Sequence, residues 1–248
     1  MKINENVYLV ASGKMGFDLT HPSDCNVYLL ASNGELALID SGTGYSVDEI
    51  CQSIQEYGFS LQQVTKIFLT HIHADHAGGA AQLRERTGAK VYVYEKAFQD
   101  LRDGDEDAID LTTAKKFGFY PEDYQLVPCE ADHQVKEGDV CKVGNLQVRV
   151  LETPGHSRYD ISFMVEDGDG EILLFSGDTV FYNGKISMLH TQDFHVQTLA
   201  KSIAKLSAID AGILLPGHYH FALKNGRSHI ESAHQIFQSM GVPKNIVE

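Results

Sequence analysis

Residues 70–79 read Thr-His-Ile-His-Ala-Asp-His-Ala-Gly-Gly and follow directly on the apolar run Ile-Phe-Leu. Such a run is typical of a short buried strand. His71 and His73 point the same way at the strand end, because side chains alternate along a strand. The chain then turns toward a helix that the two glycines are expected to open, and the turn can bring Asp75 and His76 to the same point. Imidazole and carboxylate groups suit Zn2+ and related divalent ions. The simplest interpretation is that the two histidines bind one cation and that Asp75 and His76 bind a second.

Three further residues have the same sequence context. His156 lies in Thr-Pro-Gly-His-Ser, Asp178 in Ser-Gly-Asp-Thr and His218 in Pro-Gly-His, and each follows an apolar run. A polar residue beside a glycine after an apolar run is typical of a loop held by a rigid sheet. One histidine alone in such a context is more often a core residue than a ligand. Seven residues of this kind, all at predicted strand ends, favour a metal site.

In this order, the motifs resemble those of the metallo-β-lactamase-fold hydrolase superfamily. Its mark is H-x-H-x-D-H, followed by Gly-His, a bridging Asp and a final Gly-His, and the matches here run from Asp40 to His218. The resemblance implies an α/β fold of the αββα type, a four-layer sandwich of two mixed β-sheets flanked by helices, with metals at one edge. We expect one such domain over residues 1–248.

The resemblance also implies a dinuclear centre that holds Zn2+, or else Mn2+ or Fe. The implied first-ion ligands are His71, His73 and His156, the implied second-ion ligands are Asp75, His76 and His218, and Asp178 bridges the ions. Two such ions lower the pKa of a shared water and make a metal-bridging hydroxide the nucleophile, so Asp75 and Asp178 are expected to be catalytic as well. Asp40 is expected to accept a hydrogen bond from a ligand imidazole.

The implied reaction is hydrolysis of a small carboxylic ester, thioester or lactone, as in glyoxalase II and lactonases. The alternatives are a phosphodiesterase or nuclease, a mononuclear iron dioxygenase acting on a persulfide, and a metal-holding protein without turnover. His73 favours hydrolysis, because superfamily members with two redox irons typically carry Glu there. Only one helix fits after His218, so the glutathione-binding helical domain of glyoxalase II is not expected.

Substrate-contacting residues are harder to predict. Acyl-homoserine lactonases carry a tyrosine shortly after the bridging Asp, and Tyr182 lies near that position, although Phe181 competes for it. Tyr182 is therefore a candidate oxyanion donor or a wall residue. Further polar candidates near the expected metal edge are His190, His195 and His220.

Charge and composition limit the kinds of partner and substrate that are expected. The 248 residues include 34 acidic and 20 basic side chains, a net charge of −14, and the lysines and arginines are scattered. Such a field repels phosphate backbones, so a small-molecule substrate is expected and a nucleic acid is not. No apolar stretch approaches the length of a membrane span, and the first residues lack a signal-peptide pattern, so no membrane partner and a cytoplasmic location are expected. The oligomeric state is left open, with a homodimer as one option.

The segment 95–133 is the least regular part of the chain. Its acidic run at 102–107 lacks the spacing and the closing Glu of an EF-hand, which favours a solvated loop. Aromatic residues follow, namely Phe117, Phe119, Tyr120 and Tyr124. We interpret the segment as a partly helical cap beside the metal edge that controls substrate choice. The alternative is a surface loop packed by its own aromatics.

Overall fold

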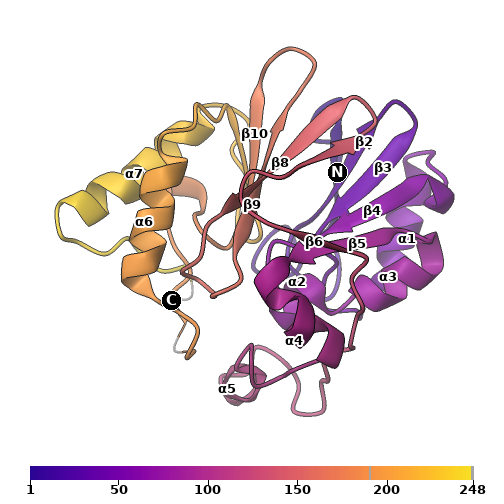
Figure 1. Ribbon diagram of the computed structural model, residues 1–248, viewed down its shortest axis with the longest axis horizontal. Helices are drawn as coiled ribbons and strands as arrows, with labels where there is room; N and C mark the ends of the chain where they lie inside the picture. Colours follow the sequence, from indigo (N-terminus) through magenta and orange to yellow (C-terminus); the bar gives the residue numbers. More distant parts are fainter. Residues whose placement is uncertain (190, 247–248) are drawn as a thin grey trace.

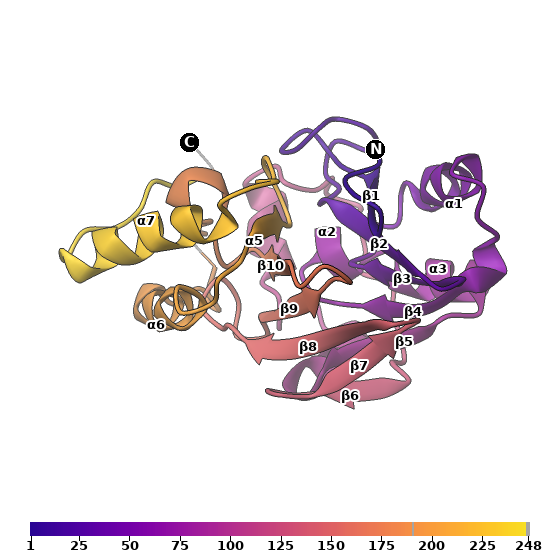
Figure 2. The ribbon, with the colours of Figure 1, turned by 90° about the horizontal axis from the view of Figure 1, so that it is seen from above.

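The structure is a computed structural model that describes residues 1–189 and 191–246. Within these residues, two mixed β-sheets lie face to face and helices cover their outer faces (Figure 1). Figure 2 shows α1 and α3 on one side of the molecule and α6 and α7 on the other. The predicted four-layer αββα sandwich is therefore confirmed.

The first sheet is built from the N-terminal half of the chain. The turn at Asn33-Gly34 joins its second and third strands as an antiparallel hairpin, and the later strands add in parallel. Helices α1 (Val47–Glu56) and α3 (Ala80–Thr87) connect parallel strands and cover the outer face. In the described residues the strand order is β1 (Val7–Ala11), β2 (Val27–Ser32), β3 (Glu35–Ile39), β4 (Val64–Phe68), β5 (Lys90–Tyr94) and β6 (His133–Val135).

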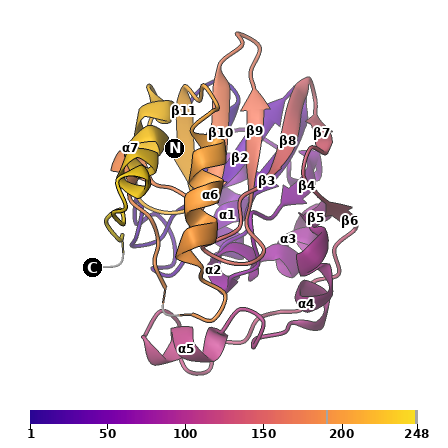
Figure 3. The ribbon, with the colours of Figure 1, turned by 60° about the vertical axis from the view of Figure 1, so that its left-hand side comes forward.

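The second sheet comes from the C-terminal half, and Figure 3 shows α6 in front of it. Helices α6 (Val196–Leu206) and α7 (Gly226–Gln238) bury Leu199, Ile203 and Ile230 against it. Across the described residues the strand order is β11 (Ile213–Pro216), β10 (Ile172–Gly177), β9 (Ile161–Glu166), β8 (Leu146–Glu152) and β7 (Val140–Val143).

Aromatic side chains join the two sheets. The ring of Phe68 in β4 lies 5.4 Å from the ring of Phe163 in β9, and the rings of Tyr28 and Phe175 are also 5.4 Å apart. The Tyr28 hydroxyl donates a hydrogen bond to the carbonyl of Pro216 at 2.8 Å. Large rings in such pairs contribute packing energy beyond the area that they bury. The sheets are thus fixed with the carboxyl ends of β3, β4, β8, β10 and β11 at one edge.

The two glycines precede a helix as predicted, because Gly79 is the residue directly before α3. A short helix that was not predicted, α2 (Ala74–Ala77), lies between β4 and the glycines, and Gly78 follows its last residue. Both glycines pack closely against the neighbouring loop. A Cβ on Gly78 would lie 2.4 Å from the carbonyl oxygen of Thr43, and one on Gly79 would lie 2.2 Å from that of Ser41. Both glycines are therefore required by steric contact.

The segment after β5 forms short helices joined by loops, at the lower end of the sandwich in Figure 1. They are η2 (Glu95–Ala97), α4 (Phe98–Asp103) and α5 (Leu111–Lys116). Two further single turns, η1 (Leu61–Gln63) and η3 (Tyr182–Gly184), precede β4 and follow β10. Among the described residues, no helix combines the length and apolarity that a bilayer crossing requires.

Candidate metal centre

The strand ends bring all of the predicted ligands to one place. His71 and His73 follow β4, Asp75 and His76 lie on α2, and the others follow β8, β10 and β11. All are buried except Asp75, whose side chain is 16% exposed. Burying so many ionisable groups together is costly unless they are paired or bind a metal.

One group consists of His71, His73 and His156. Each offers a ring nitrogen, and these atoms lie within 4.8 Å of one another. His73 Nδ1 is 3.0 Å from His156 Nε2. His71 Nε2 is buried and has no hydrogen-bond partner among the described residues. A buried imidazole nitrogen without a partner, beside two others, fits a divalent cation.

A second group consists of Asp75, His76 and His218, whose ligand atoms also lie within 4.8 Å of one another. His218 Nε2 is 2.9 Å from Asp75 Oδ2, and His76 Nε2 is 3.7 Å from the same oxygen. Two imidazoles and one carboxylate form a donor set that divalent transition metals accept.

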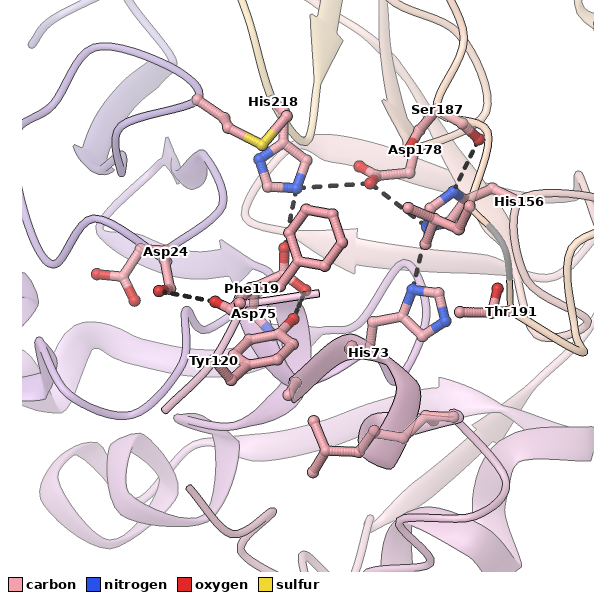
Figure 4. A pocket seen from close by; sticks show the side chains of 18 of the residues that line it. Asp24, His73, Asp75, Phe119, Tyr120, His156, Asp178, Ser187, Thr191 and His218 are labelled. Atoms are coloured by element: carbon pink, nitrogen blue, oxygen red, sulfur yellow. Dashed lines mark hydrogen bonds and ion pairs between the residues drawn. The ribbon is translucent and has the colours of Figure 1, made fainter. Parts of the chain in front are cut away.

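Asp178 lies between the two groups (Figure 4). Its Oδ2 is 3.5 Å from His156 Nε2 on one side and 3.5 Å from His218 Nε2 on the other, and its Oδ1 is 3.4 Å from His76 Nε2. Gly217 makes this approach feasible, because a Cβ there would lie 2.4 Å from Asp178 Oδ1. The carboxylate is thus placed to serve both groups.

Four of the candidate ligands have the ionisation that metal binding needs, whereas burial fails to lower the pKa values of His73, His76 and His218, which neighbouring acidic groups raise. Burial lowers the pKa of His71 well below its ordinary value and lowers that of His156 to about 4, so both imidazoles are neutral. Burial alone would raise the pKa values of Asp75 and Asp178, but the charges of neighbouring histidines outweigh it and hold both values below the usual range. Neutral imidazole and ionised carboxylate are the forms that bind metals.

The hydrogen bond predicted for Asp40 is present. Its Oδ2 accepts from His76 Nδ1 at 2.8 Å, and its Oδ1 accepts from the Thr70 backbone N–H at 2.7 Å. Asp40 has a positive φ of 63°, a conformation that Asp tolerates better than most residues. The contact orients the His76 ring so that its Nε2 faces the second group.

Two further residues make hydrogen bonds to candidate ligands that the sequence did not predict. Asp193 Oδ2 accepts a hydrogen bond from His73 Nε2 at 3.0 Å, which leaves His73 Nδ1 for the first group. The Tyr120 hydroxyl donates to Asp75 Oδ1 at 2.7 Å. Burial and the charge of Asp75 raise the pKa of Tyr120 well above its ordinary value, so the phenol keeps the proton that it donates. No local sequence pattern marks either contact.

A cavity of about 280 Å³ opens onto the cluster (Figure 4). One wall is formed by the segment between β5 and β6, and another by the loop at residues 14–24. The Ser23 hydroxyl joins these walls by donating to the carbonyl of Phe119 at 3.1 Å. Apolar side chains of the lining include Met15, Ile109, Leu111, Ala114, Phe119 and Leu189. Phe117, by contrast, is 61% exposed and does not line the cavity.

The other described candidates do not line the cavity. The Tyr182 ring packs 4.3 Å from the ring of His229, and Tyr182 is not among the described residues that line the cavity. Phe181 is buried, with its ring 6.5 Å from that of His218. The His195 side chain accepts from the Thr198 backbone N–H and so caps α6. His220 is exposed beside Phe17, and His190 lies outside the described residues.

Tyr182 therefore does not occupy the place that its spacing from Asp178 indicated. The chain after Asp178 continues through Val180 and Phe181, both fully buried, and η3 carries Tyr182 onto α7 instead. Tyr120, from a different segment, is the tyrosine that reaches the cluster.

Comparison with known proteins agrees with this architecture. The family model of the metallo-beta-lactamase superfamily matches residues 21–218, which include every candidate ligand. The chain belongs to the metallo-beta-lactamase superfamily.

Among curated relatives, the hydroxyacylglutathione hydrolase of Rhodopseudomonas palustris (strain HaA2) is 32% identical over 153 residues, or 62% of this chain and 46% of that protein. The probable metallo-hydrolase YqgX of Bacillus subtilis (strain 168) is 28% identical over 200 residues, or 79% of this chain and 86% of that protein. The match thus spans about half the length of the hydroxyacylglutathione hydrolase. A metallo-hydrolase is the class that these relatives support.

Solved structures support the fold. GOB-18, a metallo-beta-lactamase from Elizabethkingia meningoseptica, matches with a TM-score of 0.74 and 22% identity, over 96% of this chain and 89% of that chain. BJP-1, a subclass B3 metallo-beta-lactamase of Bradyrhizobium japonicum, matches with a TM-score of 0.71 and 24% identity, over 97% and 92%. At this identity the likeness concerns the fold alone.

Proposed function

We propose that the chain is a dinuclear metal-dependent hydrolase that cleaves a small carboxylic ester, thioester or lactone. The observation that carries the proposal is the position of Asp178, whose carboxylate lies within 3.5 Å of His156 in one group and of His76 and His218 in the other. One carboxylate between two donor groups is the arrangement that two neighbouring cations require.

In this proposal His71, His73 and His156 would hold one ion, Asp75, His76 and His218 the other, and Asp178 both. When bound, two Zn2+, Mn2+ or Fe ions would polarise the substrate carbonyl and ionise a water molecule for attack. Asp40 and Asp193 fix the rings of His76 and His73 through hydrogen bonds to their outer nitrogens. The apolar lining excludes bulk water from the reacting group, which strengthens electrostatic effects there.

The cavity favours a substrate with an apolar acyl part. Its volume of about 280 Å³ is at the small end of ligand pockets, and Ile109, Leu111 and Phe119 line one side. Lys14 is the one lysine or arginine among the described residues that line it, which argues against a polyanionic substrate. The hydroxyacylglutathione hydrolases among the relatives act, by their name, on an acylated glutathione, which supports acyl transfer to water as the reaction class. A cytoplasmic location and small-molecule partners, without nucleic acid or membrane, remain part of the proposal.

A substrate panel tests the reaction class. We expect metal-loaded protein to hydrolyse lactones, thioesters or carboxylic esters faster than phosphodiesters or β-lactams, because the net charge of −14 disfavours phosphodiesters. The measurement is kcat/KM for each class at known metal content. A preference for phosphodiesters would support the nuclease alternative, and persulfide oxidation with one bound iron would support the dioxygenase.

The wall formed by the segment after β5 is expected to control substrate ranking. Replacing Phe119 by alanine should lower kcat/KM for long acyl chains by roughly four-fold per methylene that loses contact, since a buried methylene contributes about 0.8 kcal/mol. Metal content should not change. Phe117→Ala is the matched control, because Phe117 lies in the same segment but is exposed and outside the lining. Identical acyl-chain profiles for both variants and the wild type would mean that the segment is only a surface loop.

A further inference from the structure

Tyr120 makes both of its hydrogen bonds with one residue. Its hydroxyl donates to Asp75 Oδ1 at 2.7 Å and accepts from the Asp75 backbone N–H at 3.2 Å. The other carboxylate oxygen, Asp75 Oδ2, lies 2.9 Å from His218 Nε2. Tyr120 thus occupies one oxygen of Asp75 and leaves the second facing the proposed metal group. Figure 4 shows the Tyr120 hydroxyl directed at Asp75.

The Tyr120 ring is itself held in place. It stacks on Tyr124 with ring centroids 5.2 Å apart and planes inclined by 28°. The Tyr124 hydroxyl donates to the carbonyl of Thr43 at 2.9 Å, which anchors the stack to the loop after β3. On the other side, the neighbouring Phe119 lines the cavity and its carbonyl accepts from Ser23. The hydroxyl is therefore positioned by packing that does not depend on Asp75.

We infer that Tyr120 is a positioning residue that orients Asp75 for the second metal ion, so that the segment lining the substrate cavity is also part of the metal centre. This inference rests on the proposed dinuclear function. It gives the segment a second role beside the expected control of substrate choice: Phe119 and Tyr120 both line the cavity, and Tyr120 also donates a hydrogen bond to a proposed ligand. Removing the hydroxyl frees Asp75 Oδ1 and lets the carboxylate rotate away from His218.

The test is Zn2+ binding by chelator competition, on metal-free wild type and Tyr120→Phe. We expect the second Zn2+ to bind about 10–100-fold more weakly in the variant and the first to bind unchanged, as is typical when an outer hydrogen bond to a ligand is lost. Co2+ spectra should show the loss at one site only. In turnover at fixed metal concentration, kcat should fall while KM changes little, because phenylalanine keeps the ring that lines the cavity and lacks only the hydroxyl that donates to Asp75.

Tyr124→Phe is the matched control. It removes a buried hydroxyl from the same stack, but that hydroxyl contacts backbone carbonyls and no candidate ligand side chain. Equal weakening in both variants would assign the effect to packing and overturn the inference. Adding Tyr120→Phe to an Asp75→Ala protein should cause no further loss in second-site Zn2+ affinity or in turnover if Tyr120 acts through Asp75; additive losses would overturn the inference.

Two failures are distinguishable. If the wild type binds a single Zn2+, the dinuclear function is wrong and the inference falls with it. If the wild type binds two and Tyr120→Phe binds both as tightly, the inference alone is wrong.

Discussion

Replacing Asp178 by alanine is expected to abolish turnover while leaving the fold largely intact. Its two carboxylate oxygens lie within 3.5 Å of nitrogens from both histidine groups, so the substitution weakens both proposed sites at once. The residue follows β10 at the sheet edge and takes no part in the aromatic contacts that join the sheets. The measurements are kcat, bound metal per chain and far-UV circular dichroism.

Asp40→Ala is the comparison variant, in which a smaller loss of turnover is expected. Asp40 accepts a hydrogen bond from His76 and contacts neither the cavity nor the other group, so we expect a loss of about 10–100-fold, far less than for Asp178. An Asp178→Ala protein that kept near-wild-type kcat with both metals bound would show that the bridging role is assigned to the wrong residue.

The second large effect concerns the metal itself. We expect two ions per chain after reconstitution with zinc, manganese or iron, because the candidate ligands form two groups that share Asp178. Elemental analysis of protein purified without chelator is the measurement. A value that stays near one would contradict the dinuclear centre, and one iron per chain would favour the dioxygenase alternative.

Removal of the metal should also destabilise the fold. Ions that bind only the native state stabilise it by about 2.7 kcal/mol at 100 times the Kd. For a chain of this size that corresponds to a fall in Tm of roughly 5–10 °C on chelation, measurable by calorimetry. In the metal-free state, His71 Nε2 is left buried without a hydrogen-bond partner among the described residues, which adds to the cost.

The strand ends that carry the cluster could be predicted from local sequence, whereas the full ligand set was implied by the resemblance to the superfamily. The apolar run before the motif predicted β4, and His71 and His73 follow that strand in the loop to α2. The glycine beside His218 marks a loop with room for close approach. The Asp40 contact joins residues 36 positions apart and was expected from the resemblance to the superfamily, and the structure has that hydrogen bond.

The missed features depend on residues far apart in the chain. Asp193 lies 120 residues from His73, and Tyr120 lies 45 residues from Asp75, so no periodicity relates them. Gly78 and Gly79 pack against a loop more than thirty residues upstream, a contact that no local pattern marks. The predicted position of the Tyr182 side chain differs from the observed one for the same reason. Packing on α7 sets the direction of this side chain, and the spacing from Asp178 carries no information about that packing.

The origin of the two donor groups has a thermodynamic consequence. His71, Asp75 and His76 are carried by the first sheet, whereas His156, Asp178 and His218 are carried by the second. Bound metal would therefore link the two sheets through ligands from both. Coupling between sites is reciprocal, so the free energy of docking the sheets and the affinity for metal rise and fall together. A substitution that loosens the contact between Phe68 and Phe163, deep in the sandwich, would then weaken metal binding without touching a ligand.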